Sequence, residues 1–331
     1  MKQSGLNRRT FLKRVGVALP LASGATPLIA VETDSPAAAP RPKAIPAKEL
    51  KANLVIIGGG LAGCAAALAA ARNDLRVIMT EETDWIGGQL TAQAVPPDEN
   101  QWIETHGGTR SYQELRTRIR DYYRRNFPLT EAARGKKELN PGNGDVSRLC
   151  HEPRVALAVL NEMLAPFVAS SRVQILLRHV PVSAATQGDQ VEAVRVRSLE
   201  SGNEFNLIAP YFADATETGE LLPLTKTEYV TGAESQKETG ELHAKPEAEP
   251  QNMQAFTCCF AMEYLPGEDH TIEQPREWEF WRDYVPPIKP PWTGKLLDLV
   301  ACDPRNLKPR KMGFDPVAGG SFEFRIGAAD D

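Results

Sequence analysis

Three glycines near residue 60 have the spacing that is typical of a loop that binds the phosphates of a dinucleotide. Gly58, Gly60 and Gly63 form the pattern G-x-G-x-x-G. In this pattern the first glycine allows a tight turn, the second lets a pyrophosphate approach the backbone, and the third lets a helix pack closely on a strand. Glu81 lies where a carboxylate can accept hydrogen bonds from the ribose hydroxyls of an adenosine, and Glu82 is the alternative.

The segments around these glycines predict a strand, a turn, a helix and a second strand. The run 53–57 is apolar and rich in β-branched residues, which is typical of a buried parallel strand. The run 64–72 is almost entirely alanine and leucine, which favours a helix. A second apolar run, 75–80, ends at Glu81. A G-x-G-x-x-G pattern in this context is far more specific than the pattern alone, so the sequence predicts a dinucleotide site.

A second glycine pair, Gly87 and Gly88, follows Glu81, and a later apolar run ends in the turn Asp214-Ala215-Thr216-Glu217. Together with the first glycine pattern, these segments resemble the FAD-dependent oxidoreductase family with a glutathione-reductase-type FAD-binding fold. The resemblance covers residues 53–91 and 150–232. The family's turn reads D-A-T-G, whereas here the nearest glycine is Gly219.

The resemblance implies an α/β fold, with a Rossmann-like FAD-binding domain of the ββα type and an inserted, irregular α+β substrate or cap domain. It implies FAD as cofactor and a small organic molecule as substrate, from which a hydride passes to the flavin. The implied cofactor-binding residues are Gly58, Gly60, Leu61, Ala62, Gly63, Glu81, Gly87, Gly88, Val182 (as an adenine contact) and Asp214.

His151 is the candidate catalytic residue. It lies between Cys150 and Glu152, and an imidazole titrates near neutrality, so it can donate or accept a proton beside a flavin. Because a helix is expected over residues 154–167, the alternative is that His151 only caps that helix.

Two other functions stay open. The family returns to its FAD domain near the C-terminus and this sequence shows no such segment, so the resemblance implies a truncated member, and a non-catalytic nucleotide-binding remnant is the first alternative. An NAD-binding dehydrogenase is the second, and the pair Gly87-Gly88 argues against it. A disulfide reductase is disfavoured, because there is one G-x-G-x-x-G unit and Cys258-Cys259 is no CxxC pair. We expect both cysteines, and Cys64, to be packing residues.

The composition excludes several classes. Of 331 residues, 42% are hydrophobic and 24% charged, which is ordinary for a soluble globular protein. The net charge of −5 gives nonspecific nucleic-acid binding no electrostatic basis. The five histidines form no HExxH pattern and the five cysteines no CxxC pair, so we expect no metal site.

The first thirty residues resemble a twin-arginine export signal. The order Asn7-Arg8-Arg9-Thr10-Phe11-Leu12-Lys13 carries the resemblance, and a weakly apolar run to Ala30 follows. That run is short and interrupted by prolines, so we expect no stable membrane span in the mature chain. The resemblance implies the twin-arginine machinery as a partner and a periplasmic or otherwise exported location.

The domain organisation follows from these segments. We expect a signal peptide at 1–30, a Pro/Ala-rich linker at 31–48, an FAD-binding domain at 49–232 with a helical insertion at about 100–168, and a partial substrate or cap domain at 233–331. Further strands are expected at 173–177, 190–197 and 205–212. A helix at 111–126 carries apolar residues at helical spacing, which favours packing over binding of an anionic substrate.

Overall fold

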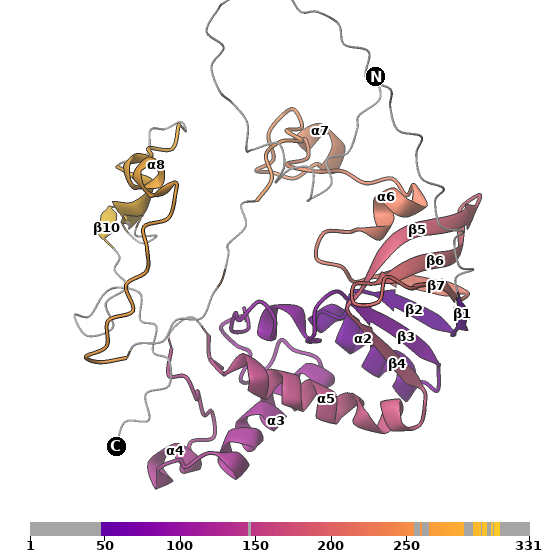
Figure 1. Ribbon diagram of the computed structural model, residues 1–331, viewed down its shortest axis with the longest axis horizontal. Coiled ribbons are helices and arrows are strands. Elements are labelled where there is room, and N and C mark those ends of the chain that lie inside the picture. Colours follow the sequence, from indigo (N-terminus) through magenta and orange to yellow (C-terminus); the bar gives the residue numbers. More distant parts are fainter. Residues whose placement is uncertain are drawn as a thin grey trace, which may run out of the picture. The chain divides into compact units, whose positions relative to one another are not determined.

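The computed structural model describes residues 48–144, 147–254, 259, 265–287, 294–298, 300–302, 306 and 308–311. The expected signal sequence, nearly all of the expected linker and Cys258 lie outside the described residues. Cys259 is described and is exposed, so the prediction that it is a packing residue was wrong. The strands (Figure 1) are β1 (Lys48–Lys51), β2 (Leu54–Ile57), β3 (Val77–Glu81), β4 (Val173–Leu177), β5 (His179–Gln187), β6 (Gln190–Ser198), β7 (Glu204–Ile208), β8 (Tyr211–Asp214), β9 (Val300–Cys302) and β10 (Pro309–Lys311).

The helices are mostly short, and three of them exceed ten residues: α2, α3 and α5. In chain order the helices are α2 (Leu61–Arg72), α3 (Arg110–Asn126), α4 (Glu131–Gly135), α5 (Pro153–Ala169), α6 (Leu221–Thr225), α7 (Gln236–Thr239) and α8 (Trp278–Asp283), with 3₁₀ turns η1 (Gly88–Leu90) and η2 (Leu296–Asp298). In the described part of the chain, no helix is long and apolar enough to cross a membrane.

A four-stranded parallel sheet in the order β4-β3-β2-β8 carries the glycine pattern. In β2, Leu54 pairs with Val77 of β3 on one side and with Tyr211 of β8 on the other. The last three residues of β2 and all of β3 are buried. Burial on both faces explains why these strands are continuous apolar runs rather than alternating ones.

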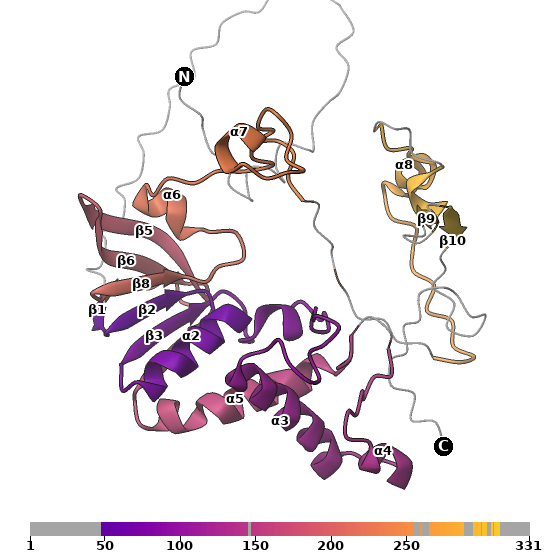
Figure 2. The ribbon, with the colours of Figure 1, turned by 180° about the vertical axis from the view of Figure 1, so that it is seen from behind.

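Alternate residues of β2 enter two different hydrophobic cores. Ile56 packs into a core with α2, α3 and α5, whereas Val55 and Ile57 pack into a second core with residues of β6 and β7. This alternation follows from the two-residue period of a strand. The result is three layers, with helices on one face of the parallel sheet and a second sheet on the other (Figure 2). The fold is therefore α/β and Rossmann-like, with the expected ββα layering.

The second sheet has the order β1-β7-β6-β5, in which β1 runs parallel to β7 and the other pairs are antiparallel. One sequence prediction was wrong here, and one strand was missed. The single strand expected at 205–212 is two strands, β7 and β8, which belong to different sheets. Pro210 lies between them, and its missing N–H interrupts a strand ladder. The strand β5 was not predicted at all, because its polar and small residues hide the alternation.

The helix α3 packs against α5 through one apolar face. Leu115, Ile119 and Tyr123 are buried there, and Thr109 caps the helix by accepting a hydrogen bond from the N–H of Tyr112. The predicted packing role of this helix is confirmed. Its two buried arginines, Arg116 and Arg120, were not predicted, and they define a part of the site described below.

Candidate functional site

Gly58 and Gly63 are required by packing at the turn between β2 and α2. A Cβ on Gly58, whose φ is +102°, would lie 2.2 Å from the carbonyl oxygen of Ala215. A Cβ on Gly63 would lie 2.0 Å from the carbonyl oxygen of Gly58. Both obstacles are backbone atoms, so a side chain at either position would have to move the strand or the helix.

Gly60 is different, because its missing side chain leaves room for a ligand. It is the N-cap of α2, with φ −58° and no capping side chain in the described structure. A Cβ there would meet only the end of the Glu217 side chain, at 3.1 Å, and the carbonyl oxygen of Ala215, at 4.0 Å. The backbone of the first helical turn, which begins with Leu61 and Ala62, therefore faces a space suited to a phosphate.

The second glycine pair closes onto the first. The N–H of Gly87 donates to the carbonyl oxygen of Gly59 over 2.8 Å. A Cβ on Gly88 would lie 3.0 Å from Cα of Gly60 and 2.8 Å from a carboxylate oxygen of Glu217. The structure thus places the predicted residues Gly60, Gly87 and Gly88 at one place, which we call the glycine cradle.

Glu81 fixes the loop from the end of β3. Its side chain is buried, and one carboxylate oxygen accepts from the N–H of Gly59 at 3.0 Å. The other oxygen accepts from the N–H and the hydroxyl of Thr83, both at 2.8 Å. A carboxylate oxygen can accept two hydrogen bonds. The oxygen that accepts from Gly59 can therefore accept a second one, from a ribose hydroxyl.

Cys64 is a packing residue, as its position predicted. It is 3% exposed, and its thiol donates to the carbonyl oxygen of Gly59 at 3.3 Å. Burial, and after it the charge of Glu81, raise the pKa of this thiol to about 12. A thiol that stays protonated is a poor nucleophile, so Cys64 is chemically inert here.

Asp214 shapes a turn with both of its oxygens. One accepts from the N–H of Thr216 at 3.0 Å and from its hydroxyl at 2.7 Å, and the other accepts from the N–H of Leu221 at 2.9 Å. The turn packs Ala215 against Gly58, so Asp214 helps to fix the backbone next to the glycine cradle. Glu217 then projects its carboxylate beside the cradle.

Val182 is not brought to the glycine cradle by any contact among the described residues. It lies on β5, in the second sheet, where the pairing with β6 shifts between Pro181 and Ser183. Its assignment as an adenine contact stays a prediction.

His151 precedes α5 in a segment held by two long-range hydrogen bonds. The N–H of Cys150 donates to Asn140 at 2.6 Å, and the N–H of Glu152 donates to the hydroxyl of Tyr123 at 2.8 Å. The helix N-cap is Glu152, so His151 does not have the alternative capping role.

The contact of the His151 ring with the backbone favours one tautomer. The ring Nδ1 lies 3.0 Å from the carbonyl oxygen of Glu152, which only accepts, so Nδ1 carries the proton. Burial lowers the pKa of His151, against smaller effects of the Glu152 backbone and of the Glu99 charge. The neutral ring therefore presents Nε2 as an acceptor. This Nε2 is enclosed and has no partner among the described residues.

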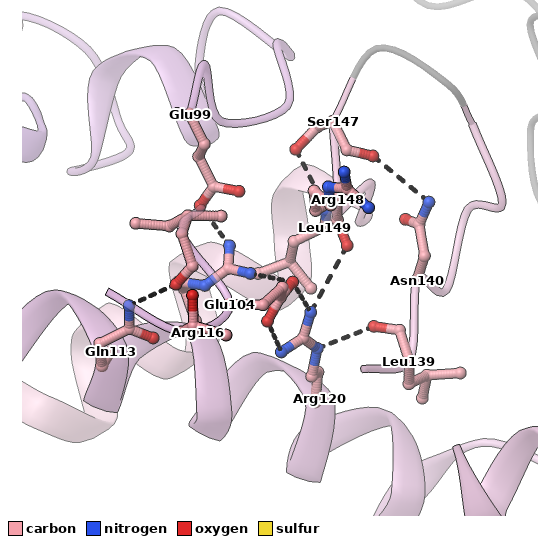
Figure 3. A network of polar contacts seen from close by, with 12 residues as sticks. Glu99, Glu104, Gln113, Arg116, Arg120, Leu139, Asn140, Ser147, Arg148 and Leu149 are labelled. Carbon is pink, nitrogen blue, oxygen red and sulfur yellow. Dashed lines mark hydrogen bonds and ion pairs between the residues drawn. The ribbon is translucent and has the colours of Figure 1, made fainter. Parts of the chain in front are cut away.

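Figure 3 shows a buried charge network that was not predicted from the sequence. Arg116 pairs with both Glu99 and Glu104, and its side chain is 1% exposed. Arg120 pairs with Glu104 at 2.6 Å and donates to the carbonyl oxygen of Leu139 at 2.9 Å. The feature of the sequence that could have indicated this network is the pair Arg116 and Arg120, four residues apart and next to the apolar face of the predicted helix.

The geometry now defines the class of protein. A parallel sheet with G-x-G-x-x-G between its first strand and helix, a carboxylate ending the next strand and a second glycine pair on the loop is a Rossmann-type dinucleotide-binding site. A family model described as FAD dependent oxidoreductase matches residues 53–311. The chain therefore belongs to the FAD dependent oxidoreductase family, and its cofactor is FAD.

Solved structures give more distant similarities. L-proline dehydrogenase from P. horikoshii is 17% identical over 51% of this chain and 23% of that chain, with a TM-score of 0.28. The myxobacterial chondrochloren halogenase CndH is 22% identical over 50% of this chain and 37% of that chain, with a TM-score of 0.32. Sdh1 of Mycobacterium smegmatis is 13% identical over 51% of this chain and 34% of that chain, with a TM-score of 0.35.

The chain thus spans between 23% and 37% of the lengths of these three chains. Comparison with curated protein sequences gives no significant match.

The residues of the glycine cradle fit FAD. Gly60 and Gly88 leave backbone open where a pyrophosphate must approach, and the first turn of α2 supplies N–H groups without a capping side chain in the described structure. Glu81 stands beside Gly59 at the place of the ribose carboxylate. One feature opposes the fit: the Glu217 carboxylate lies beside the space for the phosphates.

Proposed function

We propose that this protein is an exported FAD-dependent oxidoreductase that transfers a hydride from a small organic substrate to the flavin. The observation that carries the proposal is the hydrogen bond from Gly87 to Gly59, 2.8 Å long, which joins the two glycine segments into one cradle. Two segments that the family uses for one cofactor therefore meet in space.

The chain's own residues bind and orient in this proposal. The N-terminus of α2 and the backbone of Gly60 hold the pyrophosphate, Glu81 accepts from the ribose, and Gly88 lets the cofactor pass close to the backbone. When bound, FAD would supply the two-electron chemistry of hydride transfer. His151 is the proposed proton acceptor, since its enclosed Nε2 is unprotonated.

Hydride transfer can be tested by the spectrum of the purified full chain. We expect visible flavin absorption in the protein as isolated or after adding FAD, and anaerobic loss of that absorption with one class among a set of small amines, alcohols and acids. A folded protein that binds no flavin would contradict the whole proposal. Bound flavin that no such compound reduces would contradict the hydride-transfer part.

Export is a separate part of the proposal and rests on the twin-arginine pattern at Arg8 and Arg9. We expect residues 1–47 fused to a reporter protein to direct it across the membrane of a bacterial host. Replacing both arginines by lysine, which keeps the charge, should abolish that transport. Unchanged transport in the Arg8→Lys, Arg9→Lys variant would contradict export by this route.

A further inference from the structure

A cavity of about 230 Å³ opens beside the glycine cradle. Its lining includes Leu61 at the start of α2 and Gln89 of the second glycine segment, together with Asp98, Glu99, Asn100 and Tyr112. Pockets for drug-sized ligands measure about 300–1,000 Å³. The cavity therefore suits a small molecule, or one end of a larger one, next to the cofactor residues.

Glu99 gives this cavity an unsatisfied acceptor. Its side chain is 3% exposed. One carboxylate oxygen accepts from the Tyr112 hydroxyl at 2.5 Å and from the Arg116 guanidinium. The other oxygen is enclosed and has no partner among the described residues. Because a buried carboxylate oxygen without a donor is unfavourable, the site is complete only when a ligand or water supplies one.

Most side-chain donors of the cavity wall are already used. The Gln89 amide donates to the carbonyl oxygen of Pro96 at 3.2 Å and to Asp98 at 3.3 Å. The Asn100 amide donates one of its two N–H groups to the carbonyl oxygen of Gly107 at 3.2 Å. The charged groups that a ligand meets in this wall are the carboxylates of Asp98 and Glu99, which accept hydrogen bonds.

The charge balance also favours a cation. Behind the wall, Arg116 and Arg120 are matched by Glu99 and Glu104. The exposed Asp98 then leaves an excess of one negative charge at the cavity. The enclosed Nε of Arg116, which also has no partner among the described residues, lies on a side chain that is not part of the cavity wall.

His151 carries a second enclosed acceptor, but it is not part of the cavity wall. Its Nε2 has no partner among the described residues. Within the wall, the buried and charged side chain of Glu99 is therefore the acceptor that matches a group with N–H donors and a positive charge.

We propose that this cavity binds the ammonium group of a small organic amine, with Glu99 as its hydrogen-bond acceptor and Asp98 as the excess negative charge. Because the cavity adjoins Leu61 and Gln89, the amine would be the substrate: after its ammonium group loses a proton to solvent, its α-carbon would give a hydride to bound FAD and the amine would become an iminium ion. That identification as substrate rests on the proposed function, whereas the binding site itself does not.

Three compounds with one carbon frame test the proposal: butylamine, butanol and butyrate. Their binding to the full chain is measured by ligand-observed NMR at neutral pH, with and without FAD. We expect butylamine to bind about tenfold or more tightly than butanol, since a charge-assisted hydrogen bond is roughly twice as strong as a neutral one, and butyrate not to bind. Equal binding of butylamine and butanol, or no binding of butylamine, would overturn the proposal.

Variants locate the binding. Glu99→Gln keeps the shape of the side chain and leaves Arg116 its partner Glu104, and it should weaken butylamine binding about tenfold. Asp98→Asn changes an exposed residue that does not pair with the arginines, and it should weaken binding about two- to threefold. Glu192→Gln, on the exposed side of β6, is the control and should change nothing.

If Glu99→Gln does not fold, as shown by circular dichroism, Asp98→Asn decides: unchanged butylamine binding in that variant would overturn the proposal. The experiment also separates the two proposals. Butylamine binding without any FAD binding would leave the amine site standing and refute the proposed function. FAD binding without butylamine binding would refute the amine site and leave the proposed function standing.

Discussion

The glycine cradle and the charge network beside it are built in opposite ways. The glycine cradle is made of backbone at the edge of a parallel sheet, and, like the neighbouring turn with Gly58 and Gly63, it depends on positions that carry no side chain. The network is made of long charged side chains that meet from α3 and from the loops around it. Substitutions that add a side chain should therefore disrupt the glycine cradle, whereas substitutions that remove a charge should disrupt the network.

The largest effect is expected in the network. Arg116→Met should lower the free energy of unfolding by about 3–5 kcal/mol, because it leaves the buried Glu99 without its cation and leaves Glu104 with Arg120 alone. Arg118 on the same helix pairs with Glu114 and Glu162 in solvent. Arg118→Met, the matched control, should cost about 0–1 kcal/mol. Denaturant unfolding measures both, and equal losses would contradict the view that burial makes the difference.

In the glycine loop, Gly63→Ala should lower the free energy of unfolding by about 1–3 kcal/mol, because its Cβ would lie 2.0 Å from a backbone oxygen. Gly135→Ala in α4, where a Cβ would meet nothing within 4 Å, is the control. Thermal unfolding compares the two. A Gly63→Ala protein as stable as the control would show that the loop is not packed as described.

The network should also make stability depend on pH. Burial acts to raise the pKa of Glu104, but hydrogen bonds and charges from Arg120 and Arg116 outweigh it and lower that pKa. Its stabilisation is therefore complete above the ordinary carboxyl pKa of about 4.3 and is lost as the pH falls through the lower folded-state value. Unfolding between pH 7 and 3 should show this loss, and Glu104→Gln should lack that part of the pH dependence.

The smallest effect is expected at Glu217, whose carboxylate lies beside the cradle. Glu217→Gln should bind FAD a few-fold more tightly, because a charge in solvent about 4 Å from a phosphate is worth about 1 kcal/mol. Fluorescence titration with FAD measures the affinity, with Glu192→Gln as the control. Weaker binding by Glu217→Gln would mean that Glu217 helps to hold the cofactor.

The cradle could be predicted from the sequence because its parts are local. Gly58 to Gly63, Glu81 and Gly87-Gly88 lie in one short stretch, and strand, turn and helix each leave a recognisable pattern there. The family resemblance from these residues is confirmed by the family model over 53–311.

The network could not be predicted in the same way. Glu99, Arg116 and Leu139 come from three segments whose meeting depends on how α3 packs, and no single-segment pattern marks a buried charge. The split at Pro210 was missed for a related reason, since two short strands in different sheets look like one long strand. The amphipathic pattern of α3 predicted its packing but not the burial of its arginines.

The most direct test of the account is an FAD titration of Gly60→Val beside the unchanged chain and Gly135→Val. Gly60 has a backbone conformation that any residue can adopt, and a Cβ there would meet only the movable end of the Glu217 side chain at close range. This variant should therefore fold. We predict that the unchanged chain and Gly135→Val bind one FAD and that folded Gly60→Val binds none. Stoichiometric FAD in folded Gly60→Val would contradict the assignment of the glycine cradle as the cofactor site.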